Sequence, residues 1–286
     1  MFRNLSLRTI GIQASLDEAA KLAQAAGFEG MDIDMNEVVE LARTESIEHV
    51  RSLFEKAGLR FGGWELPVRW KEEDEALFRA DLDQLSILAS IGRTLGCTRV
   101  STWVLPYSEK RQFKENFEWH VARLQHVAAV LKRFDCKVGL EFVGTRTFRV
   151  NHRYEFIHTL QGILELCSSI EAENVGVLLD SWHWYTSHGT VEDLTQLTSK
   201  EVVNVHVNDA PIGIPIDQQI DTERQLPGET GVIDLMGFLG ALRGVGYDGP
   251  VTPEPFTEDL RRMPVSKAIQ TVGASMNQVW KAAGLG

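Results

Sequence analysis

Four side chains that can bind a metal ion or carry a proton follow apolar runs in the second half of the chain. Glu141 lies in GLEF, Asp180 ends VGVLLD, His206 lies in VNVHV and Glu254 lies in TPEP. Three carboxylates brought together would repel one another and raise their pKa values unless a cation lay between them. Three oxygen donors and one imidazole suit Mn²⁺, Mg²⁺, Co²⁺ or Zn²⁺, and the oxygen-rich set favours Mn²⁺ or Mg²⁺. The set therefore predicts a divalent-metal site, provided that the fold brings the four side chains together.

Each of these residues, taken alone, also has a structural interpretation. A carboxylate at the end of a strand commonly caps the next helix. An isolated histidine commonly makes structural hydrogen bonds. The elements that carry the four residues therefore decide between the two interpretations.

The chain alternates between short apolar runs typical of strands and longer amphipathic segments typical of helices. Eight strands, most of them followed by a helix, predict parallel pairing and a single-domain (β/α)₈ TIM barrel over residues 1–286. A doubly wound open sheet is the structural alternative, but no glycine-rich phosphate turn follows an early strand. Expected strands cover 5–12, 28–35, 59–67, 97–106, 136–143, 174–180, 201–209 and 249–256; expected helices cover 15–27 (with Ser15 and Glu18 as a capping box), 46–58, 74–96, 116–134, 153–169, 191–198 and 234–245, and a last helix from about 264 closes the barrel.

Chemistry in a barrel takes place at the C-terminal ends of the strands, where the four candidate ligands all lie. His183 follows Asp180 by three residues, so both can face the barrel mouth. Trp64 and Trp103 lie near the ends of the third and fourth strands, where aromatic faces could stack on a sugar ring or simply fill the core. Glu65 could hydrogen-bond a sugar hydroxyl or cap the following loop.

Two arginine-bearing loops also belong to this end of the expected barrel. Arg224 lies in DTERQLPGETG, a loop long enough to form a lid, and could bind a hydroxyl, carboxylate or phosphate. Arg146, Arg149 and Arg153 form the densest basic stretch and could recognise an anionic substrate. A solvated loop explains both sets equally well or slightly better.

Composition limits the classes of function. The net charge of −11 argues against binding nucleic acid through phosphate contacts, and no apolar run is long enough to span a bilayer. The N-terminal stretch lacks a clean apolar core with a cleavage site, so we expect a cytoplasmic protein. Cys97, Cys136 and Cys167 are odd in number and widely spaced, which predicts buried thiols rather than disulfides or a zinc cluster. Homo-oligomerisation stays open.

With its motifs in this order, the chain resembles the xylose isomerase-like TIM-barrel superfamily of sugar isomerases, epimerases and apurinic endonucleases. The resemblance covers nearly the whole chain and is most specific in GLEF, LLDSWH, VNVHVND, QLPGETGVID and VTPEPF. It implies that Glu141, Asp180, His206 and Glu254 bind one divalent metal ion. It also implies that Glu141 and Glu254 move the proton and that His183 contacts substrate or supports the metal site. The family's mononuclear epimerases usually carry an arginine sooner after the histidine, whereas DAPIGIPID has none.

The expected reaction is isomerisation or epimerisation of a sugar or keto-sugar. A metal ion chelated by a carbonyl and its neighbouring hydroxyl acidifies the adjacent C–H bond, and a carboxylate removes the proton to give an enediolate. Loss of a β-hydroxyl from the same intermediate would make the enzyme a lyase acting on a keto-inositol or keto-sugar, which is the main alternative. An apurinic endonuclease is disfavoured because FGGWELP and VSTWVLP lack the histidines that three zinc ions would need. A non-catalytic sugar-binding barrel is disfavoured by the four intact ligand positions.

Overall fold

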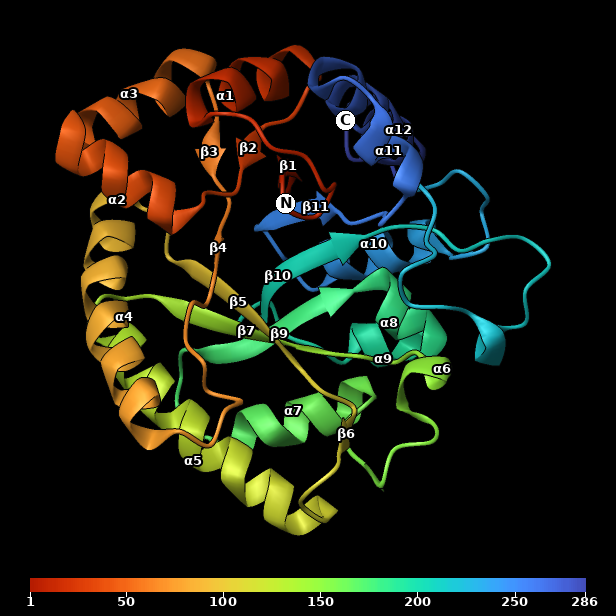
Figure 1. Cartoon of the computed structure of the whole chain (residues 1–286). Coiled ribbons are helices and arrows are strands. Elements are labelled where there is room, and N and C mark those ends of the chain that lie inside the picture. Colours follow the sequence, from red (N-terminus) through yellow and green to blue (C-terminus); the bar gives the residue numbers. More distant parts are fainter.

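The strands of the computed structural model, which describes residues 1–286, form one curled parallel sheet with helices around it (Figure 1). The sheet order places the first strand, β1, beside the last, β11, as a barrel requires. The fold is therefore the (β/α)₈ TIM barrel that the sequence predicts. The barrel strands are β1 (Phe2–Leu5), β2 (Gly30–Met31), β3 (Arg60–Phe61), β4 (Trp64–Glu65), β5 (Arg99–Val104), β7 (Lys137–Phe142), β9 (Val175–Asp180), β10 (Val202–Val207) and β11 (Pro250–Pro253), and β6 (Tyr107–Ser108) pairs with β8 (Tyr154–Glu155) outside the barrel.

The third barrel strand is split into β3 and β4, which are the two ends of the sheet order. β3 pairs with β2 and β4 pairs with β5, and only Gly62 and Gly63 separate them, so this one segment closes the barrel. A Cβ atom on Gly62 would collide with the side chains of Asn4 and Asp32. The glycines therefore let the backbone approach a polar layer inside the barrel.

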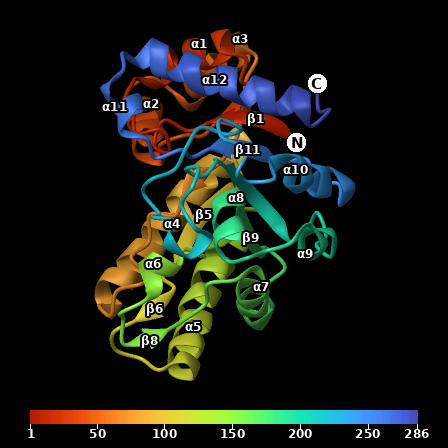
Figure 2. The ribbon, with the colours of Figure 1, turned by 90° about the vertical axis from the view of Figure 1, so that its right-hand side faces the viewer.

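The helices surround the barrel, and the C-terminal helix lies beside the first one (Figures 1 and 2). The predicted helix from about 264 is thus found as α12 (Val265–Ala282), which contacts α1 and α10. The helices are α1 (Leu16–Ala25), α2 (Met35–Thr44), α3 (Ile47–Ala57), α4 (Glu75–Leu95), α5 (Phe113–Lys132), α6 (Arg146–Arg149), α7 (Leu160–Ser169), α8 (Ser181–Thr186), α9 (Val191–Thr195), the 3₁₀ turn η1 (Ile216–Gln218), α10 (Leu235–Gly244), α11 (Glu258–Arg262) and α12 (Val265–Ala282).

Local capping explains why several predicted helices begin and end where they do. The Ser46 hydroxyl accepts a hydrogen bond from the backbone N–H of His49, and Gly58 adopts a left-handed conformation after α3. Asp74 and Gly96 bound α4 in the same way. In α1 the Ser15 hydroxyl accepts from the N–H of Glu18, but the reciprocal half of the predicted capping box is not formed.

Several elements differ from the expectation. The helix expected over 153–169 begins only at Leu160, because Tyr154 and Glu155 form the strand β8. The first strand covers Phe2–Leu5 rather than 5–12, because the chain turns after Ser6: Thr9 donates to the Ser6 and Pro253 carbonyls. The helix α2 was not predicted, because the strand expected over 28–35 extended to its first residue, Met35; only Met35 and Val38 of its residues are buried. The six-residue helix α8 is too short to leave a periodic pattern.

The apolar residues of β9 and the three cysteines are buried, as the sequence predicts. Val177, Leu178 and Leu179 of β9 are all buried, as expected for a strand of a parallel sheet that is covered on both faces. The three cysteines are buried and free, and burial raises the pKa of Cys136 to about 11 and that of Cys167 to about 12. None of the helices combines the length and apolar character needed to cross a membrane.

Candidate metal centre

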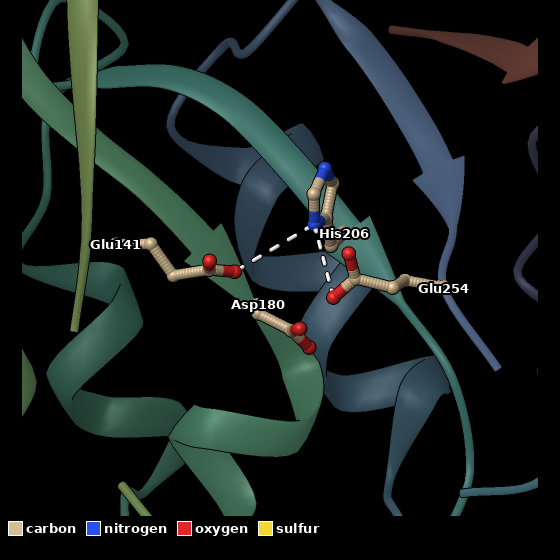
Figure 3. A group of neighbouring side chains, drawn as sticks. All are labelled: Glu141, Asp180, His206 and Glu254. Atoms are coloured by element: carbon tan, nitrogen blue, oxygen red, sulfur yellow. Dashed lines mark ion pairs between the residues drawn. The ribbon is translucent and has the colours of Figure 1, made fainter. Parts of the chain in front are cut away.

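The four candidate ligands converge at the C-terminal ends of four neighbouring strands (Figure 3). Glu141 lies on β7, Asp180 ends β9, His206 lies on β10 and Glu254 follows β11 directly. One ligand atom from each residue lies within 4.8 Å of those of the other three, and all four residues form a buried group that could hold a metal ion. The fold therefore brings together the set that the sequence singled out.

Strand register explains this convergence. Asp180 pairs with His206 across β9 and β10, and His206 pairs with Thr252 across β10 and β11. Successive side chains of a strand point to opposite faces, so Glu254, two residues beyond Thr252, shares the face of His206. The backbone N–H of Glu254 still donates to the Val207 carbonyl, which fixes this register one step past the strand.

The donor atoms have the chemistry of a metal-ligand set. Oε1 of Glu141 and Nδ1 of His206 are buried and make no hydrogen bond, although buried polar atoms nearly always have a partner. Nδ1 of His206 lies 3.6 Å from Glu141 Oε1 and 3.4 Å from Glu254 Oε2. Metal ligation would satisfy these atoms, so the residues fit a divalent cation.

The pKa shifts of Glu141 and His206 arise from burial and from the charges of the neighbouring candidate ligands. Burial raises the pKa of Glu141, with His206 opposing and Glu254 adding to the rise. Burial by itself would lower the pKa of His206, but the charges of Glu254 and Glu141 raise it well above its ordinary value. A divalent cation would neutralise the carboxylates and would bind the imidazole in its neutral form.

Arg224 enters the centre from the long loop between β10 and α10. It is buried, and its Nη1 lies 2.8 Å from Asp180 Oδ2 and 2.9 Å from Glu254 Oε2. The guanidinium also lies against the rings of Trp182 and Phe256. The solvated loop charge that the sequence also allowed is therefore excluded, and Arg224 is an ion-pair partner of two candidate ligands.

The loop that carries Arg224 is fixed by one buried carboxylate. Asp209, just beyond β10, accepts hydrogen bonds from the backbone N–H groups of Thr230, Gly231 and Ile233. The backbones of Asp209 and Gln225 also form a two-way bridge. The loop is thus folded back over the barrel mouth and holds Arg224 in place.

His183 is buried beside the same group. The N–H of Gly144 donates to its Nδ1, which places the ring proton on Nε2. Nε2 lies 3.4 Å from Nη2 of Arg224, and Asp221 lies 3.8 Å from Nδ1. A donor thus faces each ring nitrogen, the Gly144 N–H at Nδ1 and Arg224 Nη2 at Nε2. With Nδ1 as the acceptor, the Nε2–H group has no acceptor in the chain and can donate to an oxygen of a bound ligand.

The opposite half of the mouth is open. A cavity of about 1190 Å³ extends from His206 across the ends of β1, β2 and β4. Glu65 lines it and forms an exposed ion pair with Arg8, 3.3 Å apart. The register pairs Glu65 with Ser101 and places both side chains toward the cavity.

The two predicted aromatic walls have different placements. Trp64 pairs with Val100 in the register, so its ring points outward, and its Nε1 donates to the Cys97 carbonyl. Trp64 is 3% exposed and offers no stacking face to a ligand, so its side chain belongs to the core, which was the alternative prediction. Trp103 is 36% exposed, but the ammonium of Lys71 lies 3.5 Å from its ring centroid.

The basic stretch after β7 lies away from the cavity. Arg146 pairs with Asp217, Arg149 donates to the Gly144 carbonyl and the guanidinium of Arg153 packs on Tyr154. None of the three lines the cavity of the mouth.

Asp32, Lys71 and Asp221 are charged residues near the site that sequence reasoning missed. Asp32 follows β2, lines the cavity and accepts hydrogen bonds from Asn4 and from the N–H of Gly63. Burial raises its pKa. The rule that located the four ligands, a carboxylate at a strand end, could have found it. Lys71 lies in a loop, and RWKEED gives no signal of a residue that reaches the mouth.

Comparisons with known proteins agree with this geometry. The family model described as xylose isomerase-like TIM barrel matches residues 20–277. An inosose isomerase from Bacillus velezensis is 24% identical over 90% of this chain and 89% of its own length. A 3-dehydroshikimate dehydratase from Pseudomonas putida is 24% identical over 91% of this chain, which spans 39% of that protein.

Solved structures show the same fold. A xylose isomerase domain protein from Alicyclobacillus acidocaldarius is 28% identical over 99% of both chains, with a TM-score of 0.87. The IOLI protein, whose structure is described with a bound zinc atom, is 24% identical over 99% of both chains, with a TM-score of 0.81. At that identity the second likeness concerns the fold alone.

Proposed function

The chain belongs to the xylose isomerase-like TIM-barrel family, and from this premise we propose that it is a divalent-metal-dependent isomerase or epimerase of a sugar or keto-sugar. The observation that carries the proposal is the buried group of three carboxylates and one imidazole at the C-terminal ends of adjacent strands. A barrel places reacting groups at that end. The similarity to an inosose isomerase over 90% of the chain supports a polyhydroxylated ketone as the substrate class.

Glu141, Asp180, His206 and Glu254 would hold the metal ion. When bound, a divalent cation there supplies a Lewis acid that acidifies the C–H bond next to a carbonyl. The oxygen-rich donor set favours Mn²⁺ or Mg²⁺, with Co²⁺ or Zn²⁺ as the other fitting ions.

Glu141 and Glu254 are the proposed proton-transfer groups. They come from β7 and β11, the outer two of the four strands, so they lie on opposite sides of the centre (Figure 3). One carboxylate can therefore remove a proton from one face of a substrate while the other returns a proton to the opposite face.

His183 and Arg224 are the proposed positioning groups. Nε2 of His183 carries a proton that no acceptor in the chain takes, so it can donate to a substrate oxygen. Arg224 holds Asp180 and Glu254 in place by ion pairs and can move one of its donors to a substrate oxygen. Glu65, which lines the cavity, and Trp103, which is exposed beside Glu141, would contact the distal part of the substrate.

A lyase is the second candidate, because a 3-dehydroshikimate dehydratase is similar over 91% of this chain. The same proton removal by Glu141 followed by loss of a β-hydroxyl would give an enone. The two candidates share the removal of the proton and differ in the next step. An isomerase or epimerase returns a proton to carbon, whereas a lyase eliminates the β-hydroxyl as water.

We propose a cytoplasmic location and a small-molecule carbohydrate substrate. Three free, buried cysteines are typical of a protein kept in a reducing compartment.

The deciding experiment measures solvent exchange. Protein loaded with Mn²⁺ or Mg²⁺ is incubated in D₂O with inososes and ketohexoses, and mass spectrometry detects deuterium at carbon. The proposal expects incorporation that disappears in Glu141→Gln and persists in Glu173→Gln, an exposed carboxylate outside the site. Ultraviolet absorbance of an enone identifies the lyase instead. Full activity in protein stripped of metal contradicts both candidates, and failure to bind a metal ion revives the non-catalytic barrel.

A further inference from the structure

Lys71 reaches the barrel mouth because its neighbour anchors the loop. Trp70 is 1% exposed, and its Nε1 donates to the Thr102 hydroxyl on the outer face of β5, 3.2 Å away. The next residue, Lys71, turns to the other side, where its ammonium lies 3.5 Å from the ring centroid of Trp103. A buried tryptophan thus fixes the base of a lysine that covers an inward-facing aromatic ring.

This ring is the direct neighbour of a candidate catalytic group. Trp103 on β5 and Glu141 on β7 are register partners, so their side chains leave the sheet side by side on the same face. The ammonium of Lys71 therefore lies one side chain away from Glu141, on the side of the centre opposite Arg224. The charge of Glu141 acts on Lys71 across this gap.

Lys71 is a cation without a partner. Its ammonium makes no ion pair or hydrogen bond and rests only on the rings of Trp103 and Trp70. Burial lowers the pKa of Lys71 to about 8, while Glu141 and Glu65 oppose this fall, so most of the population stays charged at neutral pH. Glu65 is paired with Arg8, and a metal ion would take the charge of Glu141. In the metal-loaded protein no carboxylate of the chain would remain to neutralise Lys71.

We propose that Lys71 binds a carboxylate of the substrate, so that the site selects a keto-sugar acid over the neutral keto-sugar. A partly buried ammonium is stabilised by an anion that takes its place beside it. The inference rests on the proposed function, because it names the substrate class of the same site.

The charge of the cavity favours a carboxylate over a phosphate. Its lining carries the carboxylates of Asp32, Asp34, Glu37, Glu65 and Asp81, whereas its arginines, Arg8, Arg69 and Arg261, are each paired with a carboxylate. A phosphate with nearly two negative charges would be repelled by this lining. Lys71 is not part of this lining but lies close enough to Glu65 to feel its charge, and its one unpaired ammonium matches a group with one negative charge.

The test uses ligands that differ only at one carbon. Isothermal titration calorimetry measures binding to the metal-loaded protein of D-fructose, D-fructuronate and D-fructose 6-phosphate, and of D-tagatose and D-tagaturonate. In at least one pair we expect the acid to bind roughly 10- to 100-fold more tightly than the neutral sugar, the range of one charge-assisted hydrogen bond. We expect the phosphate to bind more weakly than D-fructuronate.

Variants assign the preference to Lys71. Lys71→Met should remove the difference in affinity between the acid and the neutral sugar. Lys71→Arg should keep part of this difference, and Lys110→Met, an exposed lysine paired with Glu73, should keep all of it. An unchanged melting temperature of Lys71→Met shows that the fold is intact. Equal binding of acid and neutral sugar in both native pairs, tightest binding of the phosphate, or an unchanged preference in Lys71→Met overturns the proposal.

The outcome also separates this proposal from the proposed function. If the acid preference depends on Lys71 but no sugar exchanges hydrogen with solvent, the substrate-class inference holds and the reaction is wrong. If neutral sugars exchange hydrogen equally well in native protein and in Lys71→Met, and no acid is preferred, the reaction holds and the role of Lys71 is wrong.

Discussion

The two halves of the barrel mouth place their charges in different environments. In the half formed by β7, β9, β10 and β11, Asp180 and Glu254 are at most 4% exposed and Arg224 is 2% exposed. In the half formed by β1, β2 and β4, the ion pair of Arg8 and Glu65 is about half exposed and borders a cavity of about 1190 Å³. The first half is covered by the loop that Asp209 holds, and the second is open.

This difference suggests a division of roles, in which the buried half carries out the reaction and the open half selects the substrate. Charges out of water interact strongly and are costly to leave unpaired, so the buried half fixes the groups that move a proton. Exposed ion pairs contribute about 0–1 kcal/mol and rearrange easily, so the open half can adapt to the distal part of a substrate. Identical substitutions in the two halves should therefore have very different effects.

Glu254→Gln, in the buried half, should have the largest effect. It removes a charged ligand and a proton-transfer group, and loss of a positioned acid or base alone typically lowers the rate by about 10²- to 10⁴-fold. The measurement is the rate of deuterium incorporation from D₂O at saturating metal. A decrease of less than about tenfold would show that Glu254 does not move the proton.

Arg224→Met should have the next largest effect. Removing one partner of a buried ion pair costs about 3–5 kcal/mol, because Asp180 and Glu254 would remain as buried, uncompensated carboxylates. Added Mn²⁺ should restore more stability to this variant than to native protein, since the cation replaces the missing positive charge. Urea denaturation with and without metal measures both quantities. An equal effect of Mn²⁺ on the stability of the two proteins would show that Arg224 does not compensate the charges of Asp180 and Glu254.

The folding stability of the metal-free protein should depend on pH through the buried half and not through the open half. Burial would raise the pKa of Asp180, but Arg224, His183 and His206 lower it from 3.8 to about 2. A carboxyl with a lowered folded-state pKa stabilises the fold above its unfolded pKa, and this contribution is lost as the pH falls from about 4 toward 2. The loss is on the order of 2 kcal/mol. Asp180→Asn should flatten this part of the stability curve, whereas Asp34→Asn, an exposed carboxyl that lines the open half, should leave it unchanged.

The buried half could be predicted from sequence because strands constrain it. Glu141, Asp180, His206 and Glu254 each end an apolar run, and parallel strands in a barrel bring such ends together whatever the helices do. The fold was predicted for the same reason, with eight alternating units as the signal. The first strand was misplaced because an element of four residues leaves little periodicity, whereas α2 was missed although its residues do have helical periodicity.

The open half could not be predicted to the same depth because loops determine it. The sequence around Lys71 has no pattern that indicates that Trp70 anchors this loop on β5. The outward direction of Trp64 depends on the register of a two-residue strand, and a shift of one residue would reverse it. Arg224 was found as a loop residue, but its ion pairs with Asp180 and Glu254 depend on how Asp209 folds the loop back.

Glu65→Gln, the same substitution as in Glu254 but in the open half, should have the smallest effect. Breaking the half-exposed pair with Arg8 should change the free energy of unfolding by less than about 1 kcal/mol. If Glu65 hydrogen-bonds a distal hydroxyl in ground state and transition state alike, KM should rise roughly 3- to 10-fold while kcat stays the same. Steady-state kinetics separate the two constants, and Glu48→Gln, on the exposed face of α3, is the matched control. A large fall in kcat would mean that the open half takes part in proton transfer, and the division between the two halves would then be wrong.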